Sequence, residues 1–298
     1  MLYTMKKISV LFLLSLLTSL TINSQELYKD SGYVDVPEGG KLYYEAYGKG
    51  TPMILIHGHT LDRRMWRQQI PRFAKRFRVI TPDMRGYGRS SRQHEDQTVT
   101  HVDDLIALMD ALGISKAHVV GLSMGGFIAS DMLAMYPERM ITCVLASGNL
   151  RSVKGPSEPV EVAERAETDA KIREVLEMGI DKWRRDWIDK LIKGGGSKAE
   201  SIRSELTAII NDWDGWQLVN HEPRLYYARE ALPVLQEKMP EVPTLFLSGE
   251  MEHKKPASLM KYIPNSEFEV ILDCGHMSNM EQPDKFNKAV ITFIERNE

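Results

Sequence analysis

The amino-acid sequence predicts an α/β protein whose core is a mostly parallel sheet with helices on both faces. Two observations predict this class. Segments with helical periodicity alternate with short apolar runs, which read MILI at 53, RVIT at 78, HVV at 118, TCVLAS at 142, PTLFLSG at 243 and EVILD at 269. Strands that are apolar throughout are buried on both faces, and intervening helices let such strands pair in parallel.

The first strands of the sheet precede this alternation. SGYVDV and KLYYEAYG flank the turn PEGG, a pattern typical of an antiparallel hairpin. The two hairpin strands and the six apolar runs together give eight strands. The segments with helical periodicity include residues 65–75, 102–112, 126–136 and 283–296.

A charged, helical insertion interrupts the alternation at residues 150–239, between core segments at residues 25–149 and 240–298. It contains a short glycine run at residues 194–196, whose role as a hinge is left open. Four of the five tryptophans lie in it, namely Trp183, Trp187, Trp213 and Trp216. Tryptophans are highly buried on average, so packing is the usual role at this density. The alternative is that they form a wall that binds substrate.

The first 24 residues have the layout of a secretory signal peptide. Lys6 and Lys7 precede a 13-residue apolar run at residues 8–20, and small and polar residues follow it. The run is too short for a comfortable transmembrane span. We therefore expect a signal peptide at residues 1–24 and a periplasmic or secreted protein with no stable membrane span after cleavage. An uncleaved membrane anchor is the alternative.

Composition limits the partners and the cross-links of the chain. The 38 basic and 41 acidic residues are spread along the sequence and give a net charge of −3, so we expect no nucleic-acid partner. The only cysteines are Cys143 and Cys274. On next-but-one strands they would lie about 9.6 Å apart at a strand spacing of ~4.8 Å, beyond the ~7 Å limit of a disulfide. We expect two buried thiols.

The stretch ILIHGHTLD at residues 54–62 contains three potential metal ligands, His57, His59 and Asp62. An apolar strand that ends in His-x-His begins either a metal site or the oxyanion hole of a metal-free enzyme. Metallo-β-lactamase-like sites have the order His-x-His-x-Asp-His, whereas Asp62 comes one residue late here and Arg63 follows it. We therefore expect no metal at this position.

The stretch HVVGLSMGGF at residues 118–127 has the pattern of a nucleophile elbow. An apolar strand runs into Gly121-x-Ser123-x-Gly125 and continues directly into a helix. Such a turn strains the backbone of its central residue, and the glycines Gly121 and Gly125 avoid collisions at its flanks. Ser123 would thereby stand above the sheet edge, beside free N–H groups at the helix start. A plain glycine-rich turn is disfavoured by this position between strand and helix.

These motifs resemble those of the α/β-hydrolase superfamily, and the resemblance covers nearly the whole chain after the signal segment. HGH at 57–59, ITPDMRGYGRSS at 80–91 and DCGHMSNMEQPDKFN at 273–287 match further family motifs in the family's order. The resemblance implies an α/β-hydrolase fold, with the helical insertion as a cap domain. GLSMGG and RGYGRSS look most like the serine-nucleophile enol-lactonase and perhydrolase branches.

The resemblance also assigns roles in a catalytic site. Ser123 would be the nucleophile, with His276 as its base because the chain order serine, acid, histidine matches the family. The backbone amides of His59 and Met124 would form the oxyanion hole. The family usually has aspartate three residues after the glycine at position 249, where this chain has Glu252, and Glu250 is the alternative acid. Asp83 and Arg85 would hold the turn after their strand.

The preferred hypothesis is an exported serine hydrolase that acts on a small or medium carboxylic ester, lactone or related acyl compound. No metal or organic cofactor is required, and the expected partner is the small-molecule acyl substrate. One alternative keeps the triad and changes the reaction to perhydrolysis (cofactor-free haloperoxidase), C–C bond hydrolysis or amide hydrolysis. Another is a non-catalytic protein that only binds ligands. The oligomeric state, acyl chain length and stereochemistry stay open.

Overall fold

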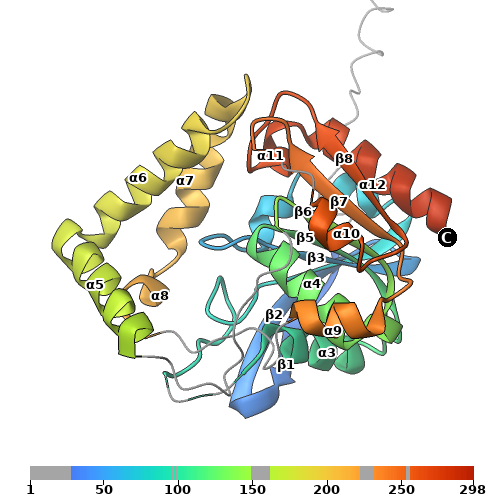
Figure 1. Ribbon diagram of the computed structural model, residues 1–298, viewed down its shortest axis with the longest axis horizontal. Coiled ribbons are helices and arrows are strands. Elements are labelled where there is room, and N and C mark those ends of the chain that lie inside the picture. The colour runs from blue at the N-terminus through green and yellow to red at the C-terminus, as the bar shows by residue number, and fades with distance from the viewer. Residues whose placement is uncertain (1–27, 96, 98, 149–161, 222–230, 253–255) are drawn as a thin grey trace, which may run out of the picture.

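The computed structural model describes residues 28–95, 97, 99–148, 162–221, 231–252 and 256–298. The expected signal peptide at residues 1–24 lies outside these residues. Eight strands form one sheet in the order β1-β2-β4-β3-β5-β6-β7-β8, and helices lie on both of its faces (Figure 1). The predicted α/β class and the eight strands are confirmed.

The sheet begins with the expected hairpin and continues in parallel. β1 (Tyr28–Val36) pairs antiparallel with β2 (Gly40–Tyr47), and β2 pairs antiparallel with β4 (Phe77–Pro82). All further pairings are parallel. They join β4 to β3 (Thr51–Ile56), β5 (Ala117–Leu122), β6 (Met140–Ala146), β7 (Thr244–Gly249) and β8 (Ser266–Ile271).

Alternate residues of the parallel strands are buried in two different cores. Ile54 and Val119 belong to a cluster with side chains of α3 (His101–Ala111), α4 (Met124–Met135) and α9 (Ala231–Lys238). Their neighbours Leu55 and Val120 belong to a second cluster with α2 (Ile70–Phe73) and α12 (Pro283–Asn297). Burial on both faces explains why these strands read as continuous apolar runs.

One predicted helix is wrong in detail. Residues 65–75 do not form a continuous helix but a 3₁₀ turn, η2 (Arg63–Trp66), followed by the short α2. Pro71 has no N–H to donate to the carbonyl of Arg67, so the helical hydrogen bonds cannot run through this segment. The other three predicted helices are confirmed as α3, α4 and α12. Short elements complete the core: η1 (Pro37–Gly39), η3 (Pro137–Arg139), α10 (Ala257–Met260) and α11 (Ser278–Glu281).

The insertion forms a helical layer beside the sheet (Figure 1). It contains α5 (Val162–Met178), α6 (Ile180–Lys193), η4 (Ala199–Ile202), α7 (Arg203–Asp212) and α8 (Trp216–Val219). Ile188 of α6 and Leu206 of α7 join the second core cluster, which attaches this layer to the rest of the molecule. α9 falls in the range assigned to the insertion, yet it packs on α4 of the core.

Two further expectations concern side chains and membrane spans. Cys143 and Cys274 are both free and buried, as predicted. Burial raises the pKa of the Cys274 thiol to about 12, so it is protonated near neutral pH. Within the described ranges, no helix has the length and apolar character needed to cross a membrane.

Candidate active site

The predicted elbow lies between β5, which ends at Leu122, and α4, which begins at Met124. Ser123 has φ 56° and ψ −114°, a conformation that L residues rarely adopt. A Cβ on Gly121 would lie 2.0 Å from the carbonyl oxygen of Gly125. A Cβ on Gly125 would lie 2.1 Å from the carbonyl oxygen of Ile56. Only glycine fits at these two positions while the turn keeps its shape.

The structure brings His276 to Glu252. His276 Nδ1 lies 3.0 Å from Oε2 and 3.1 Å from Oε1 of Glu252, so the ring N–H points between the two carboxylate oxygens. Glu250 does not take this position, because its Oε2 accepts the backbone N–H of Asp273 at 2.9 Å. Burial acts to raise the pKa of Glu252. The hydrogen bond and charge of His276 outweigh burial and hold that pKa below its usual value.

Ser123 and His276 border the same part of the sheet edge. A Cβ on Gly148 would lie 2.2 Å from the carbonyl oxygen of Ser123. Gly148, Glu252 and His276 all line one cavity of about 250 Å³. No hydrogen bond joins Ser123 Oγ to His276 in the part of the chain that the structure describes. The structure therefore pairs His276 with Glu252 and brings Ser123 to the same part of the sheet edge without a hydrogen bond to His276.

The two residues expected to form the oxyanion hole flank Ser123. Met124 is the first residue of α4, where a helical N–H has no acceptor within its own helix. A Cβ on Gly58 would lie 3.5 Å from Ser123 Cβ, so the His-Gly strand end that precedes His59 lies against the elbow. The His59 side chain turns elsewhere, because its Nδ1 lies 2.6 Å from the hydroxyl of Tyr87.

The other two potential metal ligands of the opening motif make structural hydrogen bonds. His57 Nε2 accepts the backbone N–H of Met84 at 2.9 Å, and Nδ1 lies 2.8 Å from the carbonyl oxygen of Gly58. Burial lowers the pKa of His57, so its ring is neutral. Asp62 accepts the backbone N–H and the guanidinium of Arg64. The described residues contain no cluster of three His, Cys, Asp or Glu side chains that could hold a metal ion.

Asp83 and Arg85 hold the turn after β4. The Asp83 carboxylate accepts the backbone N–H groups of Arg63 and Arg89, each at 2.9 Å. Arg85 and Asp104 form a buried ion pair with an N–O distance of 2.6 Å. These contacts fix the loop that carries Tyr87 against His59. Tyr87 was not singled out from the sequence, since the RGYGRSS pattern does not reveal which of its side chains faces inward.

Three of the four tryptophans of the insertion form a row that ends at the proposed oxyanion loop. Trp213 follows α7, is only 5% exposed, and meets the His59 ring edge-on at 5.2 Å between centroids. Trp183 lies 6.0 Å from Trp213 and 5.9 Å from Trp187 between ring centroids. Trp216 does not join this row, because its ring lies under the Arg92 guanidinium at 5.6 Å. Trp213 is a packed residue, whereas Trp183 and Trp187 are partly exposed.

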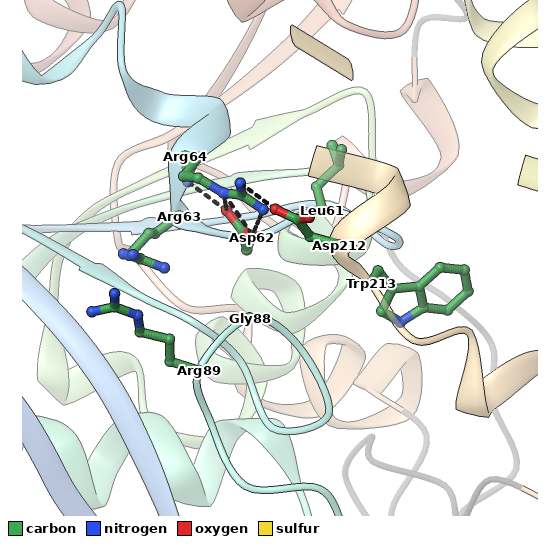
Figure 2. Close-up of a pocket in the computed structure, with 8 residues that line it drawn as sticks. All are labelled: Leu61, Asp62, Arg63, Arg64, Gly88, Arg89, Asp212 and Trp213. Atoms are coloured by element: carbon green, nitrogen blue, oxygen red, sulfur yellow. Dashed lines mark hydrogen bonds and ion pairs between the residues drawn. The ribbon is translucent and has the colours of Figure 1, made fainter. Parts of the chain in front are cut away.

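Two ion pairs hold the chain on both sides of Trp213. Arg64 Nη1 lies 2.7 Å from Asp212 Oδ2, and Arg92 Nη1 lies 2.7 Å from Asp214 Oδ2. Figure 2 shows Arg64 reaching from η2 to Asp212 at the end of α7. The cavity in this view has a volume of about 320 Å³ and is lined by Leu61, Asp62, Arg63, Arg64, Gly88, Arg89, Asp212 and Trp213. It marks the seam between the insertion and the core.

Comparison with known proteins supports the same fold. A family model described as the alpha/beta hydrolase fold matches residues 51–172. The chain is 28% identical over 286 residues to 2-hydroxy-6-oxo-6-(2'-aminophenyl)hexa-2,4-dienoic acid hydrolase from Metapseudomonas resinovorans, covering 90% of this chain and 93% of that protein. It is 25% identical over 266 residues to 3-oxoadipate enol-lactonase 1 from Acinetobacter baylyi, covering 86% and 94%. A solved thermophilic esterase from Thermogutta terrifontis has a TM-score of 0.69 at 25% identity, covering 90% of this chain and 99% of that chain.

The sheet order, the elbow and these similarities together define the class of protein. The chain has the α/β-hydrolase fold. The similar proteins named above are hydrolases, among them an esterase and an enol-lactonase, and hydrolysis is the reaction class that the comparisons support. The resemblance identified from the sequence is confirmed.

Proposed function

We propose that the chain is an exported serine hydrolase that cleaves a small or medium carboxylic ester or lactone with Ser123, His276 and Glu252. The observation that carries this proposal is the His276–Glu252 hydrogen bond, 3.0 Å long, at the sheet edge beside the strained Ser123. A serine hydroxyl needs a neighbouring base to act as a nucleophile near neutral pH. The carboxylate keeps the proton on Nδ1, which leaves Nε2 free to accept the Ser123 proton.

The first half of the reaction forms an acyl-enzyme. Ser123 Oγ attacks the carbonyl carbon of the substrate while His276 Nε2 takes the hydroxyl proton. The carbonyl oxygen becomes an oxyanion, which accepts hydrogen bonds from the amides of His59 and Met124. The C–O bond to the alcohol then breaks, and His276 gives its proton to the departing oxygen. In a lactone, this alcohol stays attached to the acyl group.

The second half of the reaction regenerates the enzyme. His276 takes a proton from water, whose oxygen attacks the acyl carbon, and the amides of His59 and Met124 again stabilise the oxyanion. The bond to Ser123 Oγ breaks, and Oγ recovers its proton from His276. The acid is released, and each half consumes only substrate or water. No metal or organic cofactor takes part.

The decisive experiment is the Ser123→Ala variant with a fluorophosphonate probe and p-nitrophenyl esters. Labelling and turnover should both disappear in this variant, because the attacking oxygen is missing. Near wild-type turnover in Ser123→Ala would rule out the serine mechanism. A His276→Ala variant with undiminished turnover would favour a reaction that does not use this base.

Export is a separate part of the proposal and rests on the charged and apolar pattern of residues 1–24. The full chain, expressed in a bacterial host, should yield a shortened protein outside the cytoplasm. N-terminal sequencing of that protein locates the cleavage site. A full-length product in the membrane fraction would instead support the uncleaved anchor, and a full-length product in the cytoplasm would contradict export.

One alternative reaction has an observation in its favour. The relative from Metapseudomonas resinovorans is named as the hydrolase of a 2-hydroxy-6-oxo dienoic acid, a compound that contains no ester bond. A hydrolase of such a compound cleaves a C–C bond with water, and the same serine, histidine and carboxylate can serve for that reaction. A 2-hydroxy-6-oxo dienoate assayed beside an ester and an enol-lactone separates these reactions. The largest kcat/KM among the three identifies the substrate class.

A further inference from the structure

The turn of the cap at residues 194–197 packs against the loop that carries His276. A Cβ on Gly196 would lie 2.2 Å from the carbonyl oxygen of Asp273. A Cβ on Gly275, which directly precedes His276, would lie 2.2 Å from the carbonyl oxygen of Gly194. Real side chains do not approach backbone this closely. Close packing between two backbones therefore accounts for Gly196 and Gly275, and a hinge is not needed to explain them.

A buried carboxylate joins the same two segments. Glu281 is 2% exposed, and no cation among the described residues forms an ion pair with it. Its Oε2 accepts the N–H of Gly196 at 2.7 Å, and its Oε1 accepts the N–H of Gly275 at 3.1 Å. Burying an unpaired carboxylate is costly, and two backbone donors offset only part of that cost. An apolar residue here would leave both buried N–H groups without an acceptor, so the two carboxylate oxygens are what join the cap turn to the loop of His276.

The loop before His276 is held from two further directions. The carboxylate of Asp273 accepts the backbone N–H of Ser197 at 2.7 Å and its hydroxyl at 2.5 Å. On the opposite side, a Cβ on Gly249 would lie 2.2 Å from the carbonyl oxygen of Gly275. Gly249 ends the strand that leads to Glu252. The loop at residues 273–276, here called the histidine loop, is thus held between the end of β7 and the cap turn at residues 194–197.

We propose that Glu281 is a positioning residue that fixes the His276 imidazole by binding the cap turn and the histidine loop at once. The cap then contributes to catalysis through backbone contacts as well as through any contact with substrate. This inference rests on the proposed function, in which His276 is the base. Displacing a catalytic group by about 1 Å can cost roughly a hundredfold in rate, so loss of this bridge should act on the chemical step.

Three variants test the proposal. Glu281→Gln keeps the shape but leaves only one accepting oxygen, so one of the two N–H groups loses its partner. Gly196→Ala puts a Cβ 2.2 Å from the Asp273 carbonyl oxygen and separates the turn from the loop without touching Glu281. Gly194→Ala is the matched control, because the nearest atom to its Cβ would be the Lys190 carbonyl oxygen at 3.3 Å, within its own helix end and away from the histidine loop.

The measurement is kcat and KM for p-nitrophenyl acetate. Active sites are counted by end-point fluorophosphonate labelling, so that unfolded chains are not included in the enzyme concentration from which kcat is calculated. We expect kcat to fall roughly tenfold or more in Glu281→Gln and Gly196→Ala, with KM changed by less than about twofold. Gly194→Ala should match the wild type. The initial rate of labelling should fall in parallel with kcat, because it also needs an oriented base.

The possible outcomes separate this inference from the proposed function. Wild-type kcat per labelled site in both Glu281→Gln and Gly196→Ala, beside an inactive Ser123→Ala, would refute the positioning role alone. A lower melting temperature with unchanged kcat would give Glu281 a purely structural role and would refute it too. Turnover in Ser123→Ala would overturn both proposals. If Glu281→Gln fails to fold, Gly196→Ala against Gly194→Ala decides the question.

Discussion

Replacing Glu252 by glutamine tests the pairing on which the proposed mechanism depends. The carboxylate accepts one ring N–H of His276 through both oxygens, at 3.0 and 3.1 Å. Glutamine has nearly the same shape but no charge, and it can turn its NH₂ group toward Nδ1. The variant therefore removes the stabilisation of the imidazolium and favours the wrong tautomer, while the packing changes little.

The size of the effect follows from the distance and the exposure. Two unit charges at the observed 3.0 Å attract by about 5.5 kcal/mol at an effective dielectric constant of ~20. The two side chains are 25% and 35% exposed, and fully exposed pairs give no more than ~1 kcal/mol, so we take about 3 kcal/mol. At ~1.36 kcal/mol per factor of ten, kcat falls roughly a hundredfold. The wrong tautomer would extend the loss toward ~10⁴.

The assay is kcat/KM for p-nitrophenyl esters, with Glu250→Gln as the matched control. Glu250 accepts the backbone N–H of Asp273, and glutamine can keep that bond. We expect the control to stay within about twofold of the wild type, the equivalent of ~0.5 kcal/mol. A Glu252→Gln variant that keeps near wild-type activity, or a larger loss in Glu250→Gln, would refute this assignment of the acid.

Three other predictions concern packing, the cap and pH. Trp213→Ala should lower the free energy of unfolding in urea by about 3–5 kcal/mol, since Trp213 is 5% exposed. Trp216→Ala is the control, because Trp216 is only partly buried, and equal losses in the two variants would show that Trp213 is not a core residue. The double variant Asp212→Asn, Asp214→Asn should lower stability by at most ~2 kcal/mol, since partly exposed ion pairs contribute ~1 kcal/mol or less each. It should raise KM more than it lowers kcat, and an unchanged KM, measured at low salt, would mean that these ion pairs do not hold the cap. Burial lowers the pKa of His118 to about 4, so the folded protein keeps this ring neutral at pH values where the unfolded chain protonates it. The contribution of the neutral His118 to the free energy of unfolding is full above pH 6.5 and is lost as pH falls toward 4, by about 1.36 kcal/mol per pH unit. The free energy of unfolding should therefore fall less between pH 7 and pH 5 in His118→Gln than in the wild type, and an equal fall would contradict this.

Much of the fold could be predicted because its causes are local. The continuous apolar strands, the turn glycines and the helical periodicity each reflect a short-range requirement of the backbone. Gly121 and Gly125 are glycines because a Cβ would collide with backbone at 2.0 and 2.1 Å. Pro71 shows the limit of periodicity, since a single missing N–H divides a segment whose apolar pattern is helical.

The sequence by itself determined the α/β class, the eight strands, the strained serine turn and the order of the candidate site residues, because these are written in spacing and residue type. Only the tertiary structure decided which of two glutamates two residues apart meets His276, because that depends on how the loops after β7 and β8 face each other across a parallel pair. It also decided that the glycines at residues 194–196 lie against the histidine loop and that Glu281 bridges the two. Contacts between segments about 80 residues apart leave no periodic trace in a single sequence, because each partner satisfies its local requirements equally well without the other.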